Sequence, residues 1–258
     1  MKKIFNSYAD HYDLFYKSKN YKKEAQFVLG ILKSNKIYTG KLLDFGCGTG
    51  IHAISLSKNN FKVLGIDQSN EMIKIAKDKI KFNKLKNIDF NKGDINNIKL
   101  KDKFNSVISL FHVFSYQTHN NDVINFLKNA NFHLKKNGLL IFDFWYGPGI
   151  IISKQINRQK KIKVKNELFV RTSSPTINYF ENSVNVNIFV TKSSNKKKEV
   201  LTNENHNMRY FFVQELELFL NITGFKILNL HKSFKKNKPT NNDWTAMIIA
   251  KKIRLNIL

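Results

Sequence analysis

The sequence has only one cysteine, Cys47, among its 258 residues. An internal disulfide is therefore excluded, and a metal cluster would have to use histidine and carboxylate ligands. Long apolar segments are also absent, because no run approaches the roughly 20 residues that span a bilayer. The first residues lack the apolar stretch of a secretory signal. These absences lead us to expect a cytoplasmic, bacterial-type enzyme or binding domain.

Arginine is scarce in a strongly basic chain. Only four of the 44 basic residues are arginines, although the formal net charge is +25. Such a charge is typical of nucleic-acid binding, but arginine is the residue that reads phosphates and base edges with two-pronged geometry. The charge is spread along the chain, so we interpret the lysines as a solvated surface and do not expect a nucleic-acid partner. A weaker alternative is that the electrostatic field of the whole protein attracts a small substrate that carries phosphate.

The composition is that of a globular chain with a sizeable core. Hydrophobic residues make up 42% of the sequence, and 22 residues are phenylalanine. Between residues 21 and 144 the apolar pattern alternates between strand and helix periods. The predicted elements are a helix at 21–34, a strand at 41–45, a helix from residue 51, a strand at 61–66, a helix at 70–82, strands at 88–91 and 106–110, a helix at 122–134 and a strand at 138–144. This order predicts an α/β fold with a mainly parallel sheet covered on both faces.

The pattern changes after the segment Gly147–Gly149, which closes the last of these strands. Residues 162–170 and 184–190 alternate apolar and polar side chains, as half-solvated antiparallel strands do. Polar turns are expected at 182–183 and 193–198. We therefore predict an inserted antiparallel β subdomain at 150–212, with 1–149 and 213–258 forming the main domain. The second part of that domain is expected to hold a helix at 213–220, ended by Gly224, and strands at 225–230 and 245–250.

The strongest chemical signal is the segment from Leu42 to Gly50, which follows a strand and opens a helix. Glycines at 46 and 48 permit a tight turn and the close approach of a ligand to the backbone. The N–H groups at the start of the next helix suit a carboxylate or phosphate. A Gly-x-Gly-x-Gly sequence alone is weak evidence, but its position after a strand, with Asp44 before the first glycine, strengthens it.

Two acids lie beyond this segment. Asp67 ends the second predicted strand and could accept both hydroxyl protons of a ribose. The alternative role is an N-cap, although Ser69 or Asn70 can fill that position. Asp94, after Gly93 and before Ile95, could accept from an adenine amino group; alternatively it only forms a turn.

Together these segments resemble the class I S-adenosylmethionine (SAM) dependent methyltransferases, over about residues 20–145. The resemblance implies a Rossmann-like sheet with a final antiparallel strand and SAM as the cofactor. Its glycine spacing differs from the Gly-x-Gly-x-x-Gly loop of nicotinamide enzymes. The cofactor contacts that it implies are Tyr12, Tyr21, Asp44, Gly46, Cys47, Gly48, Gly50, Asp67, Gln68, Met72, Gly93, Asp94, Ile95 and Leu110. Cys47 is expected to contribute only its backbone.

A narrower resemblance concerns nucleotide-sugar N-methyltransferases, whose relatives belong to surface polysaccharide biosynthesis. It rests on the segments Tyr8–Asp13, Leu110–Tyr116, Phe144–Pro148 and His206–Phe211. It implies that Tyr12 covers the cofactor, although a spacing of four residues from Tyr8 to Tyr16 is equally typical of a buried helix face. The substrate contacts that we predict are Trp145, Tyr146, Arg171 and Arg209. Arginine suits a diphosphate, and the alternative for both arginines is a surface ion pair.

The choice between methylating an amine and a hydroxyl depends on a general base, which a hydroxyl needs as it reacts. His112 and His206 are the candidate bases, and Tyr116 is a candidate positioning group. His112 follows the fourth strand, at the sheet edge where ligands collect, but a structural histidine is the alternative. The remaining histidines lack the spacing of metal ligands, so we predict no metal site.

Two other functions remain open at this stage. An RNA or DNA methyltransferase would fit the charge, but the sequence has no Asn-Pro-Pro-Tyr segment. A non-catalytic SAM-binding module would bind the cofactor without turnover. The acceptor is expected to be a small molecule, and the oligomeric state is left open.

Overall fold

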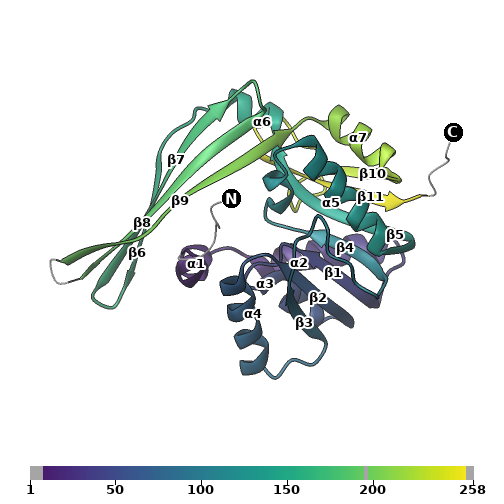
Figure 1. Ribbon diagram of the computed structural model, residues 1–258, viewed down its shortest axis with the longest axis horizontal. Coiled ribbons are helices and arrows are strands. Elements are labelled where there is room, and N and C mark those ends of the chain that lie inside the picture. The colour runs from purple at the N-terminus through teal and green to yellow at the C-terminus, as the bar shows by residue number, and fades with distance from the viewer. Residues whose placement is uncertain (1–7, 195–196, 254–258) are drawn as a thin grey trace.

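The computed structural model describes residues 8–194 and 197–253. Its centre is a parallel sheet that two antiparallel strands extend at one edge (Figure 1). The parallel strands are β1 (Gly40–Phe45), β2 (Phe61–Asp67), β3 (Ile88–Lys92), β4 (Phe104–Ser109) and β5 (Leu134–Tyr146). The antiparallel strands are β10 (Phe225–Lys232) and β11 (Thr245–Lys252). The order is β3-β2-β1-β4-β5-β11-β10, with β11 antiparallel to both of its neighbours. The predicted α/β sheet with a final antiparallel strand is confirmed.

Helices cover both faces of this sheet because its inner strands are apolar on both sides. The helices α2 (Tyr21–Ser34), α3 (Ile51–Ser57) and α4 (Asn70–Phe82) pack on the face that carries Leu42 and Ile141. The helices α5 (Asn120–His133) and α7 (Val213–Ile222) pack on the face that carries Leu43 and Phe142. Successive residues of one strand therefore pack into the cores on opposite faces of the sheet.

Local signals in the sequence set where the helices begin. The Ser69 side chain caps α4 by accepting from the Met72 N–H at 3.2 Å. Asn20 caps α2 in the same way through the Lys23 N–H at 2.9 Å. These caps explain why the predicted helices at 21–34 and 70–82 match the observed bounds.

A long antiparallel arm projects from the sheet (Figure 1). Its strands are β6 (Arg158–Val164), β7 (Glu167–Asn178), β8 (Ser183–Ser194) and β9 (Lys197–Phe211), paired in that order. Strand β9 joins the arm to the central sheet, because Tyr210 and Phe211 pair in parallel with Trp145 and Tyr146 of β5. The antiparallel strands thus lie within the predicted insert, whose exact limits stay a prediction.

One predicted strand was wrong. Residues 162–170 are the facing ends of two strands, in which Ile162 pairs with Phe169 and Val164 with Glu167. A short turn separates them, with Lys165 in the left-handed region at φ 52°. The apolar alternation continues across so short a turn, so the pattern alone did not show the reversal.

Short helices fill the junction between the arm and the sheet. These are α1 (Ala9–Tyr16), the 3-10 helix η1 (Val113–Tyr116) and α6 (Gly147–Ile152), which occupies the segment predicted only to end a strand. Phe15 and Tyr8 pack with Phe169 and Val190 of the arm. Helix α1 is thereby held against the arm. Within the described ranges, no helix combines the length and apolarity needed to cross a membrane.

Candidate active site

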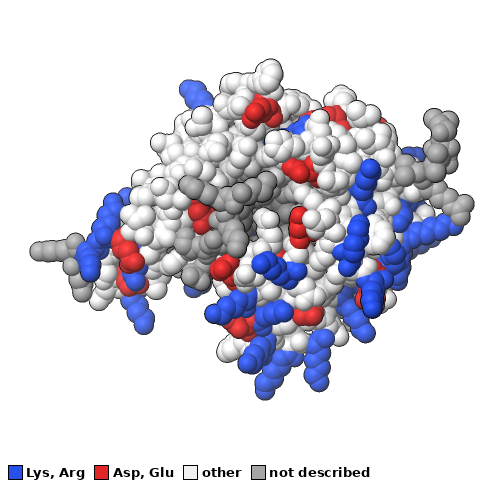
Figure 2. Space-filling model, in the orientation of Figure 1, with Lys and Arg blue, Asp and Glu red and all other residues white. Residues whose placement is uncertain are grey.

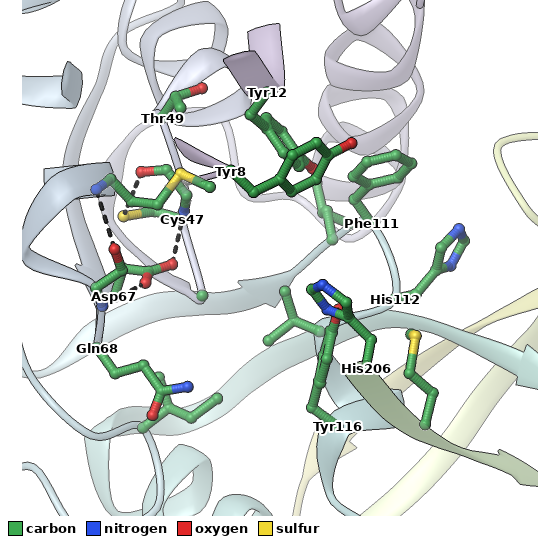
Figure 3. Close-up of a pocket in the computed structure, with 18 of the residues that line it drawn as sticks. Tyr8, Tyr12, Cys47, Thr49, Asp67, Gln68, Phe111, His112, Tyr116 and His206 are labelled. Atoms are coloured by element: carbon green, nitrogen blue, oxygen red, sulfur yellow. Dashed lines mark hydrogen bonds between the residues drawn. The ribbon is translucent and has the colours of Figure 1, made fainter. Parts of the chain in front are cut away.

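A cleft of about 960 Å³ lies at the carboxyl ends of the parallel strands and is bordered by α1 and the arm. Figure 3 shows Asp67 and Gln68 on one side of it and Tyr116 with His206 on the other. The predicted residues that line it are Tyr12, Tyr21, Asp44, Gly46, Cys47, Gly48, Asp67, Gln68, Met72, Gly93, Asp94, Ile95, Leu110, His112, Tyr116, Trp145, Arg171 and His206. Gly50, Tyr146 and Arg209 are not among the residues that line it.

Two glycines of the loop have different surroundings: Gly48 borders open space, whereas Gly50 packs closely against a neighbouring side chain. Gly48 has φ 53°, and a Cβ atom there would meet nothing within 4 Å, so its backbone faces open space. Gly50 has φ 79°, but a Cβ atom there would lie 2.4 Å from Phe90. Gly50 therefore permits the close packing of the loop against Phe90 of β3, and its contact with the cofactor stays a prediction.

Asp67 is tied to the glycine loop. Its carboxylate accepts from the Gly48 N–H and from the Ser69 N–H, both at 2.9 Å. Burial raises the pKa of Asp67, and these hydrogen bonds oppose that shift. Since Ser69 caps α4, the alternative of Asp67 as a helix cap is excluded.

Asp44 is a second buried acid at this end of the cleft, with 2% of its surface exposed. Burial, together with the neighbouring charge of Asp67, raises its pKa to about 8. Burial also raises the pKa of the Cys47 thiol, which keeps that group neutral. A pocket that buries two carboxyl groups favours a ligand that carries positive charge.

Asp94 serves the turn after β3 as well as the cleft. Its carboxylate accepts from the Asn96 N–H at 2.9 Å and from Asn97 Nδ2 at 3.0 Å. The turn that we considered as the alternative is therefore present. Asp94 and Ile95 nevertheless line the cleft. Their contact with the adenine of the cofactor stays a prediction.

Aromatic rings from α1 lie over the cleft. The Tyr12 ring lies 4.7 Å from that of Tyr16 and 6.4 Å from that of Phe111. Burial raises the pKa of Tyr12 well above its ordinary value, so its hydroxyl stays neutral. Tyr21, the first residue of α2, places its ring 4.9 Å from His52.

Helix α1 is fixed to the glycine loop by contacts that the sequence did not reveal. The Thr49 hydroxyl donates to Asp13 Oδ1 at 2.7 Å, and Lys79 Nζ lies 2.5 Å from Asp13 Oδ2. Lys79 also donates to the Thr49 carbonyl at 2.9 Å. Asp13 stands within a segment that we had singled out, but no local pattern indicates partners 36 and 66 residues away.

The two arginines predicted to bind substrate have different positions. Arg171 of β7 lines the cleft and donates from Nη1 to the hydroxyls of Tyr16 and Tyr8, at 2.7 and 3.2 Å. Arg209 donates to Asn120 and Glu215, both at 2.7 Å. Arg209 therefore forms the ion pair that is the alternative for it, because Asn120 at the start of α5 and Glu215 in the first turn of α7 hold its buried side chain.

Tyr146 also belongs to the packing of the sheet. Its ring lies 6.4 Å from that of Phe144, at the edge of the core that contains α5 and α7. The neighbouring Trp145 points the other way and lines the cleft, because successive residues of a strand face opposite sides.

His112 is held in an unusual backbone conformation at the end of β4. Both Phe111 and His112 have positive φ, at 69° and 66°. The His112 N–H donates to Asp143 Oδ1 at 2.9 Å, and His112 Nδ1 lies 3.0 Å from Asp143 Oδ2. Although burial raises the pKa of Asp143, the adjacent His112 lowers it below its ordinary value. Nδ1 is thus engaged by a carboxylate, and Nε2 is the nitrogen left for the cleft.

Tyr116 and His206 meet although 90 residues separate them. The Tyr116 hydroxyl lies 2.8 Å from His206 Nδ1, and His206 is 1% exposed. Burial raises the pKa of Tyr116 well above its ordinary value. Other described residues that line this half of the cleft, which sequence reasoning missed, are Ser173, Val186, Ile188, Asn205, Asn207 and Met208.

The residues present fit the adenosyl sulfonium ligand that the resemblance implies. The open backbone at Gly48 leaves room for it, and Asp67 stands beside that space. The Asp44 carboxyl group could balance the positive charge of the ligand, and the Tyr12 ring offers an aromatic face to it.

Comparisons with known proteins agree with this geometry. The family model of a methyltransferase domain matches residues 42–138. The dTDP-3-amino-3,4,6-trideoxy-alpha-D-glucopyranose N,N-dimethyltransferase of Streptomyces venezuelae is 28% identical over 143 residues, 55% of this chain and 58% of that relative. The ubiquinone biosynthesis O-methyltransferase of Pelagibacter ubique is 38% identical over 100 residues, 39% of this chain and 40% of that relative.

A solved structure resembles the whole chain. An S-adenosylmethionine-dependent methyltransferase from Clostridium acetobutylicum superposes with a TM-score of 0.83 at 21% identity. The superposition covers 98% of this chain and 100% of that one. This likeness shows that the arm and the central sheet occur together in another protein of this fold.

Proposed function

Because the chain belongs to the class I SAM-dependent methyltransferases, we propose that it transfers a methyl group from SAM to an amino group of a nucleotide-linked sugar. We further propose that this sugar serves surface polysaccharide biosynthesis. The observation that carries the proposal is the cleft itself, whose cofactor half continues directly into a half walled by the arm. The name of the Streptomyces venezuelae relative, a dTDP-aminosugar dimethyltransferase, supports this acceptor class.

The arm offers side chains suited to a sugar ring. Ser173 of β7, on the same face as Arg171, is an uncharged donor and acceptor, as hydroxyl groups require, and Trp145 adds a flat apolar face. In our proposal Arg171 faces the nucleotide diphosphate, since its buried Nε has no hydrogen-bond partner among the residues at 8–194 and 197–253.

The charge of the surface fits a small acceptor better than nucleic acid. Figure 2 shows lysine side chains projecting from the region of α4, while much of the arm is uncharged in this view. The lysines of α4 are Lys74, Lys77, Lys79 and Lys81. The arm residues that line the acceptor half of the cleft are mostly uncharged, whereas a nucleic-acid methyltransferase would need cations beside its acceptor.

SAM, when bound, supplies a methyl group that is already activated, so the chain's main task is positioning. Alignment of reacting groups can contribute about 7–11 kcal/mol to catalysis. Helix α1, fixed by Asp13 and Arg171, covers the cleft and excludes water. Tyr12 and Phe111 present aromatic rings that stabilise a cation.

An amine acceptor must be neutral when it attacks and must lose a proton afterwards. We propose two groups near the acceptor for that proton. His112 lines the cleft with its Nδ1 held by Asp143, and Tyr116 is paired with His206. A hydroxyl acceptor would need one of these groups to act during the transfer.

The test is an assay with the purified full chain, SAM and dTDP-3-amino-3,6-dideoxy-α-D-glucopyranose. Mass spectrometry should find a product heavier by one CH2 for each methyl group transferred. The matched control is dTDP-glucose, which has no amine and should stay unchanged. Asp67→Ala should abolish both product formation and SAM binding measured by calorimetry. No product from a panel of dTDP-aminosugars, with methylation of an RNA or DNA oligonucleotide instead, would overturn the proposed acceptor.

A further inference from the structure

We propose that the end of the central sheet opposite the cleft binds the surface of an anionic lipid bilayer. The lysines are spread along the sequence, yet the fold gathers many of them at this end. This end takes no part in the methyl transfer, so what it binds does not depend on which acceptor the cleft takes.

The order of helices and strands causes this gathering. Parallel strands begin at one edge of a sheet, and here Gly40 pairs with Phe61 and Phe104 pairs with Leu134, the first residues of their strands. The segments that enter the five parallel strands therefore lie together at that edge. These segments, which we call the basic end, are 33–41, 58–62, 81–89, 99–103 and 135–136.

The basic end carries charge of one sign. Each of its five segments has two or three lysines, and the acids among them are Asp89 and Asp102. Strand β11 is antiparallel, so its last residues reach the same edge, where Lys252 donates to the Leu134 carbonyl at 2.9 Å. Figure 2 shows lysine side chains along the lower and right borders of the molecule, away from the arm.

The opposite end of the sheet lacks this charge. The segments that follow β1, β2 and β4 at the cleft, residues 46–50, 68–69 and 110–119, contain no lysine. A lysine-rich composition alone would supply lysines to both ends of the sheet. The difference between the two ends therefore points to a partner that meets only the basic end.

Exposed aromatic rings stand among these lysines. Tyr38 precedes β1, Phe82 ends α4 and Phe132 lies in the last turn of α5, and they are 60%, 88% and 43% exposed. Lys103 Nζ and Lys99 Nζ lie 3.7 and 4.6 Å from the centre of the Phe132 ring. Basic side chains mixed with aromatic rings are typical of surfaces that lie at the boundary between lipid headgroups and acyl chains.

The chemistry and shape of the basic end favour lipid over nucleic acid. Its five segments contain no arginine, the residue that binds nucleic-acid phosphates with planar geometry, whereas lysine acts as a point charge that suits a layer of anionic headgroups. The segments are spread across a sheet of seven strands from β3 to β10, a front of roughly 30 Å at about 4.8 Å between strands. A bilayer surface can contact all of them at once.

This orientation leaves the cleft open to solvent. Strand β1 leads from the basic end to the cleft over six residues, which span about 20 Å. That distance is about twice the screening length at 0.1 M salt. The lipid charge therefore does not repel an anionic acceptor that enters the cleft from the far side.

The test measures how the full chain partitions onto vesicles of equal parts phosphatidylcholine and phosphatidylglycerol, by flotation. We expect the native chain to bind these vesicles and not to bind phosphatidylcholine alone. Bound chain should be released as salt rises from about 0.1 to 1 M, which shortens the screening length from about 10 to 3 Å.

The decisive variant combines Lys62→Gln, Lys86→Gln, Lys101→Gln and Lys136→Gln, which replace exposed lysines in four segments of the basic end. Each lysine near an anionic surface strengthens binding about fivefold, so this variant should bind the mixed vesicles at least 100-fold more weakly. Its thermal unfolding and its methylation rate in solution should match those of the native chain, because these side chains are exposed and remote from the cleft.

The matched control combines Lys154→Gln, Lys161→Gln, Lys163→Gln and Lys198→Gln. It removes the same charge from exposed lysines of the arm and of the segment before it, and should bind vesicles as the native chain does. Hydrogen exchange of the native chain on vesicles should slow at the basic end and stay unchanged in β6 and β7.

Three outcomes would overturn the proposal. Equal losses in the two variants would mean that net charge alone attracts the chain. Binding to phosphatidylcholine as strong as to the mixture would exclude recognition of anionic lipid. Release of vesicle-bound chain by RNA, at equal concentrations of RNA and lipid phosphate, would assign the basic end to nucleic acid instead. If no aminosugar is methylated, the proposed acceptor fails, while the vesicle result still decides the role of the basic end.

Discussion

Asp44 is the residue whose chemistry depends most on the ligand. Its pKa, raised to about 8 by burial, keeps the carboxyl group protonated at neutral pH in the ligand-free chain. A cationic ligand favours the carboxylate form, so we expect SAM binding at pH 7 to release a proton. Calorimetry in buffers of different ionisation enthalpy measures this release. Asp44→Asn should abolish the buffer dependence, and equal enthalpies in all buffers for the native chain would contradict it.

The same pKa shift predicts how stability depends on pH. An unfolded aspartate ionises near pH 4, so between about pH 4 and 8 the native chain holds a proton that the unfolded chain has lost. The contribution of Asp44 to stability is therefore present below pH 4 and decreases as the pH rises through about 8. Thermal unfolding of Asp44→Asn, compared with the native chain across this range, should lack that decrease.

At the scale of elements, α1 is the connection between the two halves of the cleft. Asp13 ties it to Thr49 and Lys79, while Arg171 ties it to the arm. Asp13→Ala should weaken SAM binding about tenfold, equivalent to one charge-assisted hydrogen bond of about 1.4 kcal/mol, because α1 then opens more often. Hydrogen exchange should become faster in α1.

The control for this prediction is Asp78→Ala, which removes an exposed acid from α4. It should leave both SAM affinity and exchange in α1 unchanged. Equal effects of the two substitutions would mean that Asp13 acts only through net charge.

At the scale of the whole molecule, the sheet carries the stability on which the cleft depends. Phe142 of β5 is fully buried in the core beneath α5 and α7. Phe142→Ala should lower the free energy of unfolding by about 3–5 kcal/mol, through lost burial and the cavity left behind. Phe82→Ala, at a position that is 88% exposed, is the matched control and should change it by less than about 0.5 kcal/mol. Denaturant unfolding measures both.

The order of strands and helices, and which residues meet at the carboxyl ends of β1, β2 and β3, could be predicted from the sequence. Both depend on local information: the apolar period within each element, the caps at Asn20 and Ser69, and the position of Asp67 at the end of a strand. The carboxyl ends of parallel strands lie at one edge of the sheet, so residues that follow them must meet.

Which residues line the half of the cleft beside the arm depends on the tertiary structure. The contact of Tyr116 with His206, the hydrogen bond from Arg171 to Tyr16 of α1 and the hydrogen bond from Arg209 to Asn120 each join distant segments. The hairpin within 162–170 shows the same limit, because its apolar period continues across the turn. Periodicity tells which side of its own strand a residue faces, but what it meets there depends on how the arm and α1 pack on the sheet.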